Sequence, residues 1–444
     1  MRTHPPLRRR IRVMVALGAV LLLAAAVGLR APSSPAPRRA ARPLPASATT
    51  LPTTVEGLQQ HLRSVPGDWR AWSALGSAYL DEARISGNPT LYPKAGGSFD
   101  RSLALHPDRN DLALAGRGGL ANARHRFADG LRWARRAEAV DPRNPTTLGV
   151  LGDSLLELGR YPEAFEAFQR MLDIAPGVAS YARASYAREL QGDLAGATRL
   201  FRLARQSAQS PSDAAFADYY LGELSWLTGD LDGATTAFGR AVTLDPNFAA
   251  PSAGLARLAW ARGDLPGAIR AYEAVVARFP LPQYVGDLGD LYRLAGRPQQ
   301  AADQDSLLRA QRHLLAANGV DIDLELSLFS ADHGIDLHKG LMAARAEWDR
   351  RHSIAVADAL AWQLHANRRD TEALTYADQA LRLGTRNPLF LFHRAAIEGS
   401  LGQAGAARRD LEAAAALNPR FSILHADTAA RMLDELRRST GSAR

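Results

Sequence analysis

A stretch in the first half of the chain decides the fold: residues 148–176 read LGVLGDSLLELGRYPEAFEAFQRMLDIAP. Apolar residues recur three, four and seven positions apart on both sides of Gly159-Arg160, which is the spacing of one apolar stripe on each of two helices. Glycine tolerates the positive φ at which helices commonly end. Pro176 closes the second run, because proline disfavours a helical conformation in the residue before it. The stretch therefore predicts two antiparallel helices joined by a tight turn.

The same pattern returns along most of the chain. Pro142 and Pro176 are 34 residues apart, as are Pro246 and Pro280. Recurrence at this period is typical of arrays in which each helix pair stacks on the next and no pair has a core of its own. We therefore expect an all-α solenoid of antiparallel helix pairs. The matching positions include Trp72, Leu75, Gly76, Tyr79 and Phe99 near the start, Leu221, Gly222, Ala234, Phe238 and Ala241 in the middle, and Leu391, Ala407, Leu411 and Ala414 near the end.

The quality of the repeats divides the chain into segments. We expect about seven units in 58–316, a degenerate helical repeat in 317–351, two further units in 352–424 and a terminal helix or tail in 425–444. Small residues such as Gly222 are expected to let two helices approach closely, and aromatic residues such as Phe238 to fill the gap to the next pair.

This period and pattern are similar to those of the tetratricopeptide repeat family. The resemblance implies a superhelix whose first helices line a concave surface that binds a protein partner. It suggests a bacterial, membrane-anchored member of uncharacterised role.

Projecting the clearest unit onto the others places polar and aromatic residues on the expected concave surface. Aromatic residues and arginine are the most frequent anchors of binding surfaces. The alternatives are that the tryptophans pack between neighbouring repeats and that the acidic residues only face water. The candidate partner-binding residues are Tyr186, Glu189, Tyr219, Glu223, Trp226, Arg257, Trp260, Asp290 and Arg293.

The first part of the chain has a different composition. A basic N-terminus (1–12) precedes an apolar run (13–29), and a stretch rich in Pro, Ala and Ser follows (30–57). A helix of the apolar run would be about 25 Å long, near the short end of a transmembrane span. We expect an uncleaved single-pass anchor, a linker that holds the array away from the bilayer, and an extracytoplasmic array. The alternative is a signal sequence cleaved near Ala26, which would release a secreted protein.

Charge and composition exclude several function classes. The formal net charge is +8, but residues 1–50 hold nine arginines and no acidic residue, so the remainder is close to neutral. Nucleic acid is therefore not an expected partner, because phosphate binding needs a basic domain. The absence of cysteine excludes disulfides and thiolate metal sites.

Candidate catalytic residues are few. The sequence holds neither a glycine-rich phosphate loop nor a Gly-x-Ser-x-Gly motif, and we expect no enzyme activity, no cofactor and no small-molecule substrate. His333 and His338 lie close together among carboxylates and are the best metal candidates, although a spacing of five does not place both on one helical face. Three functions follow: a membrane-tethered scaffold for a protein partner, a secreted protein of an envelope assembly or transport pathway, and a metal-handling protein that uses these two histidines.

Overall fold

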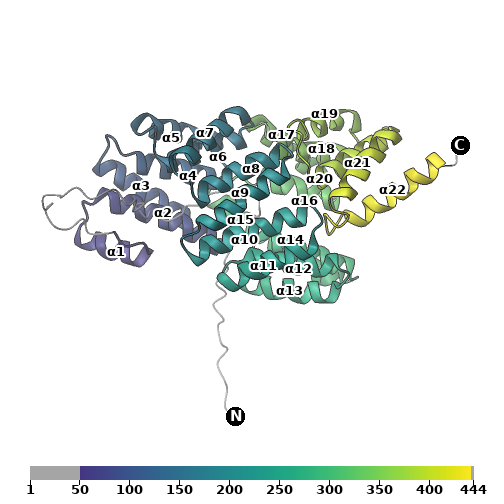
Figure 1. Cartoon of the computed structure of the whole chain (residues 1–444), viewed down its shortest axis with the longest axis horizontal. Coiled ribbons are helices and arrows are strands. Elements are labelled where there is room, and N and C mark those ends of the chain that lie inside the picture. The colour runs from purple at the N-terminus through teal and green to yellow at the C-terminus, as the bar shows by residue number, and fades with distance from the viewer. Residues whose placement is uncertain (1–50, 442–444) are drawn as a thin grey trace, which may run out of the picture.

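The computed structural model describes residues 51–441, which fold into 22 helices and contain no strand (Figure 1). The prediction of an all-α array of helix pairs is confirmed. The predicted basic segment and membrane helix lie outside the described residues, and none of the described helices is long and apolar enough to cross a bilayer. Most of the predicted linker (30–57) also lies outside the described residues, and α1 begins at Val55 within its last part, where the side chain of Thr54 accepts a hydrogen bond from the Gly57 N–H.

Seven helix pairs make up the first part of the array. They are α2 (Trp69–Ser86) with α3 (Leu91–Leu105), α4 (Asp111–Ala123) with α5 (Phe127–Val140), α6 (Pro145–Glu157) with α7 (Tyr161–Ile174), α8 (Val178–Leu190) with α9 (Leu194–Ser207), α10 (Pro211–Leu227) with α11 (Leu231–Leu244), α12 (Ala249–Ala261) with α13 (Leu265–Arg278), and α14 (Pro282–Leu294) with α15 (Pro298–Ala317). The single helix α1 (Val55–Ser64) precedes them and packs on α2.

Three more pairs follow. They are α16 (Asp323–His333) with α17 (Leu337–Arg350), α18 (Ile354–Ala366) with α19 (Asp370–Ala380), and α20 (Pro388–Ser400) with α21 (Ala404–Leu417). The helix α22 (Ala426–Gly441) packs on α21 and ends the described chain.

The turns inside the pairs have the conformation that their glycines predict. Gly192, Gly229 and Gly263 adopt positive φ values of 76°, 74° and 89°. In each case the next residue is an aspartate whose carboxylate accepts a hydrogen bond from a backbone N–H in the first turn of the second helix, at 2.8–2.9 Å. Glycine ends one helix and aspartate begins the next, so a Gly-Asp dipeptide is enough to make the turn.

Large aromatic residues occupy the space left by helical glycines. Phe238 is fully buried, and a Cβ atom added to Gly222 of its own pair or to Gly254 of the next pair would lie 2.5 Å or 2.7 Å from its ring. The expected role of this phenylalanine is confirmed. Since one ring fills the core of two successive pairs, neither pair has a separate core.

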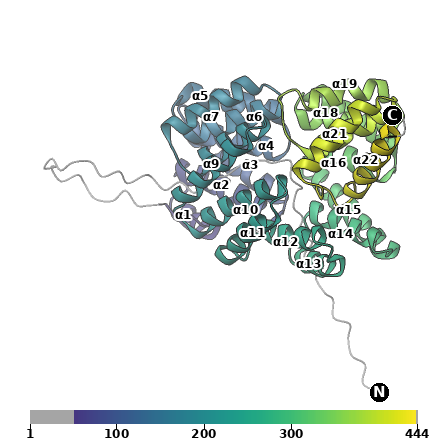
Figure 2. The same ribbon diagram turned by 45° about the vertical axis from the view of Figure 1, so that its right-hand side comes forward.

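The stacking is not continuous along the chain. Each helix from α1 to α14 packs on its successor, and so does each from α16 to α21, but α15 makes little contact with α16. The end of α15 and the residues after it contact the early repeats instead, because Leu315 and Val320 belong to the hydrophobic core of Leu58 and Leu120, and the Asp321 N–H donates to the Arg124 carbonyl at 3.1 Å. The end of the first stack thus contacts its early repeats. The helices α16–α22 form a second stack beside the first (Figure 2).

Residues of the second stack contact residues of the first stack that lie nearly the same number of positions earlier in the sequence. The His125 ring lies 2.7 Å from the Asp321 carbonyl, the Ile354 N–H donates to the Tyr161 hydroxyl at 2.7 Å, and the Asn418 amide donates to the Trp226 carbonyl at 2.7 Å. These pairs are separated by 196, 193 and 192 positions. One turn of the superhelix therefore takes between five and six repeats of about 34 residues.

A buried ion-pair cluster joins the two stacks. Arg351 binds Glu157 of the first stack and Glu347 of the second, and each of the three residues is no more than 3% exposed. A charge buried in this way needs an opposite charge close by. The sequence pattern gave no indication of this cluster.

Candidate functional site

Five of the nine predicted partner-binding residues lie on the first helices of three successive pairs. Tyr186 and Glu189 come from α8, Tyr219 and Glu223 from α10, and Arg257 from α12. All five are half-buried, and the Arg257 guanidinium donates to Glu223 at 2.7 Å. The structure adds Tyr220 and Asp287, which the sequence projection missed. We call the seven residues the inner patch: Tyr186, Glu189, Tyr219, Tyr220, Glu223, Arg257 and Asp287.

The inner patch combines aromatic rings with carboxylates of altered acidity. Burial, and next the nearby charge of Glu223, raises the pKa of Glu189 to about 7. Burial, and next the charge of Asp290, raises the pKa of Asp287 to about 6. Two carboxyl groups on one surface therefore change charge close to neutral pH.

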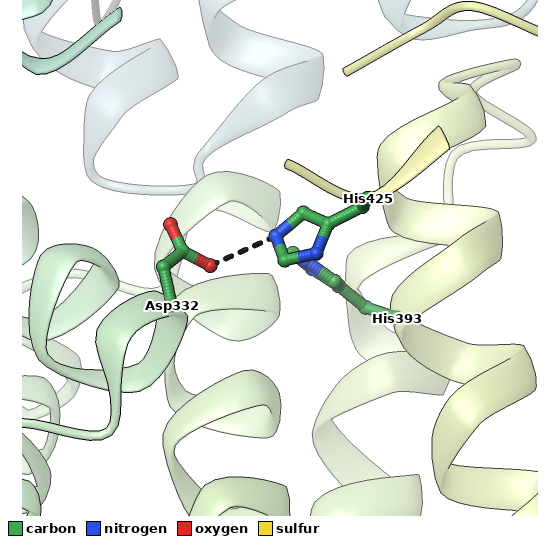
Figure 3. A group of neighbouring side chains, drawn as sticks. All are labelled: Asp332, His393 and His425. Carbon is green, nitrogen blue, oxygen red and sulfur yellow. Dashed lines mark hydrogen bonds and ion pairs between the residues drawn. The ribbon is translucent and has the colours of Figure 1, made fainter. Parts of the chain in front are cut away.

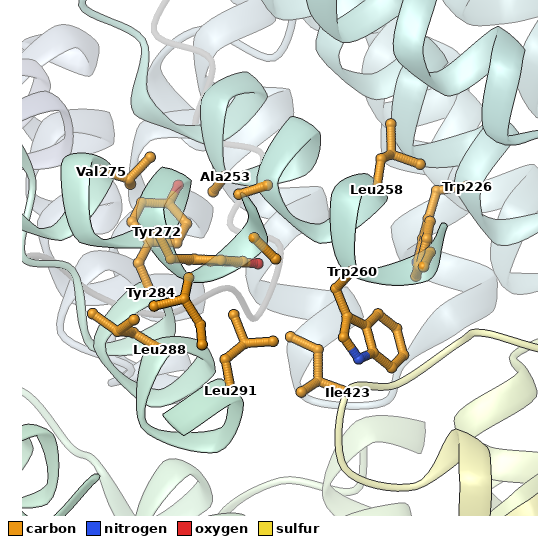
Figure 4. Close-up of a cluster of buried hydrophobic side chains, with 14 of the residues drawn as sticks. Trp226, Ala253, Leu258, Trp260, Tyr272, Val275, Tyr284, Leu288, Leu291 and Ile423 are labelled. Atoms are coloured by element: carbon orange, nitrogen blue, oxygen red, sulfur yellow. The ribbon is translucent and has the colours of Figure 1, made fainter. Parts of the chain in front are cut away.

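The two predicted tryptophans do not face an open groove. Trp226 and Trp260 are each 6% exposed and belong to one hydrophobic core together with Ile423 (Figure 4). The Arg420 guanidinium lies 5.2 Å from the centre of the Trp260 ring, and Asn418 bonds the Trp226 carbonyl. The segment between α21 and α22 thus lies against the Trp260 ring, and the Arg257 guanidinium lies 4.5 Å from the centre of the Trp226 ring. Both tryptophans are packed within the array, as the alternative interpretation of the sequence had it.

Asp290 and Arg293 are also engaged inside the molecule. Asp290 is 8% exposed and accepts from Arg293 at 2.8 Å, and the His333 Nε2 lies 2.9 Å from it. Arg293 also donates to both carboxylate oxygens of Asp305 on α15, at 2.6–2.7 Å. These two residues hold α14 to α15 and α16.

The candidate metal residues His333 and His338 lie in different surroundings. His333 has its Nδ1 2.9 Å from the Phe329 carbonyl and its Nε2 on Asp290, so both ring nitrogens are occupied. His338 is exposed in the first turn of α17. Among the described residues, the group whose geometry suits a metal ion is instead Asp332, His393 and His425 (Figure 3). Their wide separation in the sequence concealed this group.

Comparisons with known proteins agree with the architecture. Residues 113–179 and 226–288 match family models described as tetratricopeptide repeat. No curated protein matches the chain.

The solved structures that resemble the chain are distant. The APC/C hetero-tetramer Cut9–Hcn1 is 14% identical, with 86% of this chain and 92% of that chain covered and a TM-score of 0.38. A tetratricopeptide repeat protein from Parabacteroides merdae is 15% identical, with 56% and 98% covered and a TM-score of 0.40. PilW, a type IV pilus biogenesis factor, is 19% identical, with 48% and 94% covered and a TM-score of 0.38. The chain is thus an all-α array of paired helices, two segments of which match tetratricopeptide repeat models.

Proposed function

We propose that the chain is a membrane-tethered scaffold that binds a segment of a protein partner at the inner patch. Tetratricopeptide repeat proteins typically act as non-catalytic scaffolds, and the role proposed here involves neither bond making nor a cofactor. The observation that carries the proposal is the inner patch itself, where half-buried tyrosines and carboxylates from three repeats lie on first helices and act on one another electrostatically. Rigid aromatic side chains with nearby charges are typical of binding surfaces.

The charges of the inner patch indicate the chemistry of the bound segment. Arg257 already pairs with Glu223, whereas Glu189 forms no ion pair among the residues that the structure describes. Asp287 accepts a hydrogen bond from the Tyr272 hydroxyl at 3.0 Å but pairs with no cation in the described chain. A lysine or arginine between apolar residues would supply the opposite charge for these carboxylates and place its apolar neighbours on the tyrosine rings.

The experiment is a selection of peptides from a random library displayed on phage, with the purified full chain as bait. We expect peptides with a central Lys or Arg, and their loss when the bait carries Glu189→Gln together with Tyr219→Ala. The matched control is Glu166→Gln, because Glu166 is exposed on the second helix α7. Selected peptides without basic residues, or an equal yield from the inner-patch variant, would exclude the inner patch as the binding surface.

The membrane tether is part of the same proposal and rests on the apolar run 13–29 with its basic flanks. Fractionation of cells and N-terminal sequencing of the mature protein test it. An uncut N-terminus in the membrane fraction is expected. A mature protein that starts beyond Ala26 and is found outside the membrane would favour the secreted alternative, an envelope assembly or transport protein.

A further inference from the structure

Three metal-ligating side chains from distant parts of the sequence meet in the second stack. Asp332 lies at the end of α16, His393 in α20, and His425 directly before α22. One donor atom of each lies within 4.8 Å of the others, and the His425 Nε2 is 3.0 Å from an Asp332 oxygen. Figure 3 shows the His393 ring directed toward the other two side chains.

The buried His393 has a ring nitrogen that is unpartnered in the described part of the chain, which points to a bound metal ion. Its side chain is 1% exposed, and its Nε2 has no hydrogen-bond partner among the described residues. Its Nδ1 lies 3.0 Å from both carboxylate oxygens of Asp358. When a carboxylate accepts the Nδ1 proton, the Nε2 lone pair is directed outward, which is the arrangement that orients histidines toward metals. A buried nitrogen without a partner is otherwise costly.

The surroundings hold the three donors in place. The Trp362 indole N–H donates to Asp332 at 2.8 Å, and the Trp362 ring stacks on His393 with the ring centres 4.2 Å apart. The Phe392 ring stacks on His425 at 5.0 Å. Packing and hydrogen bonds therefore fix all three side chains before any ion arrives, which reduces the entropy lost on binding.

We propose that Asp332, His393 and His425 bind one divalent transition-metal ion and that Zn²⁺ fits this donor set best. Zinc takes imidazole nitrogens and carboxylate oxygens at about 2.0–2.2 Å in a tetrahedron. Two neutral imidazoles with one carboxylate do not suit Mg²⁺, which prefers oxygen ligands. The ion links α16, α20 and the segment before α22, so its role is to hold the end of the array. The fourth position is left to water or to a ligand from a partner.

The experiment uses the full chain, purified with a tag that contains no histidine and stripped of metal by a chelator. Zn²⁺ is titrated by calorimetry, and Co²⁺ is titrated by its visible absorption, which reports tetrahedral coordination. We expect one equivalent of each ion and no binding of Mg²⁺. Asp332→Asn and His425→Ala should abolish this binding, and Asp358→Asn should weaken it about 10–100-fold, because Asp358 orients His393 without touching the ion.

Two features separate loss of the site from loss of the fold. Asp332→Asn keeps an oxygen that accepts from Trp362, so the metal-free variant should unfold at the same temperature as the metal-free wild type. The control His338→Ala removes an exposed histidine in the first turn of α17, and it should bind Zn²⁺ like the wild type. The proposal is overturned if the wild type binds no single equivalent, or if Asp332→Asn and His425→Ala bind it equally tightly.

Discussion

Two turn glycines of nearly equal conformation test whether the two stacks stabilise each other. Gly159 and Gly263 have positive φ values of 78° and 89°. A Cβ added to Gly159 would lie 2.4 Å from the His352 carbonyl oxygen in the second stack, whereas nothing lies within 4 Å of a Cβ added to Gly263. Alanine is strained at both sites but collides with the second stack only at residue 159.

The expected difference in stability between the two variants follows from two costs, the left-handed backbone conformation and the collision with the second stack. A left-handed conformation costs a non-glycine residue about 1–2 kcal/mol, and this cost applies to both variants. Inserting a methyl group into a tightly packed site adds about 1–3 kcal/mol, since here the obstacle is backbone and cannot rotate away. We therefore expect Gly159→Ala to lower the free energy of unfolding by about 2–5 kcal/mol and Gly263→Ala by about 1–2 kcal/mol.

Urea denaturation measures the loss, and hydrogen exchange locates it. Exchange of the Ile354 amide, which donates to the Tyr161 hydroxyl at 2.7 Å, should accelerate in Gly159→Ala and stay unchanged in Gly263→Ala. Equal destabilisation by the two substitutions, together with unchanged exchange at residue 354, would refute the argument that the stacks stabilise each other through this contact.

Three further predictions concern charge. Arg351→Met should destabilise the protein by about 3–5 kcal/mol in urea denaturation, because it leaves the buried Glu157 without its cation and leaves Glu347 with Arg350 alone; replacing both glutamates by glutamine as well should recover much of the loss. Burial opposes the charge of His333, but the bond to Asp290 outweighs it and raises the pKa of His333, so its stabilising effect is complete below pH 6.5 and lost as the pH rises through the folded-state pKa. Thermal unfolding between pH 6 and 9 should therefore show a smaller gap between the wild type and His333→Gln at the alkaline end. Binding of a basic peptide should strengthen between pH 5 and 8 in fluorescence titrations, because Glu189 and Asp287, with pKa values of about 7 and 6, lose their protons over this range; binding that does not change with pH would contradict this reading of the inner patch.

The candidate site could be predicted from the sequence only in part. The repeat identifies which positions of a helix face its neighbours, and it placed Tyr219 and Glu223 on the first helix of their pair, where the structure has them. The same projection placed Trp226 and Trp260 on an open surface, because it could not foresee that Ile423 and Arg420 would pack near Trp260 or that both rings would join one hydrophobic core. Whether the inner patch binds a partner stays a prediction.

The sequence by itself determined the helix pairs. Apolar spacing within about 34 residues, a Gly-Asp turn and a phenylalanine opposite a glycine are local features, and each acts through neighbours a few positions away or in the next repeat. Only the tertiary structure decided how far the array closes, because each interface adds a small rotation and the sum depends on every interface before it. These added rotations place the Ile354 amide next to the Tyr161 hydroxyl and place Arg351 next to Glu157. The packing of the last pairs likewise gathers Asp332, His393 and His425 at positions whose separation in the sequence reveals nothing of their contact.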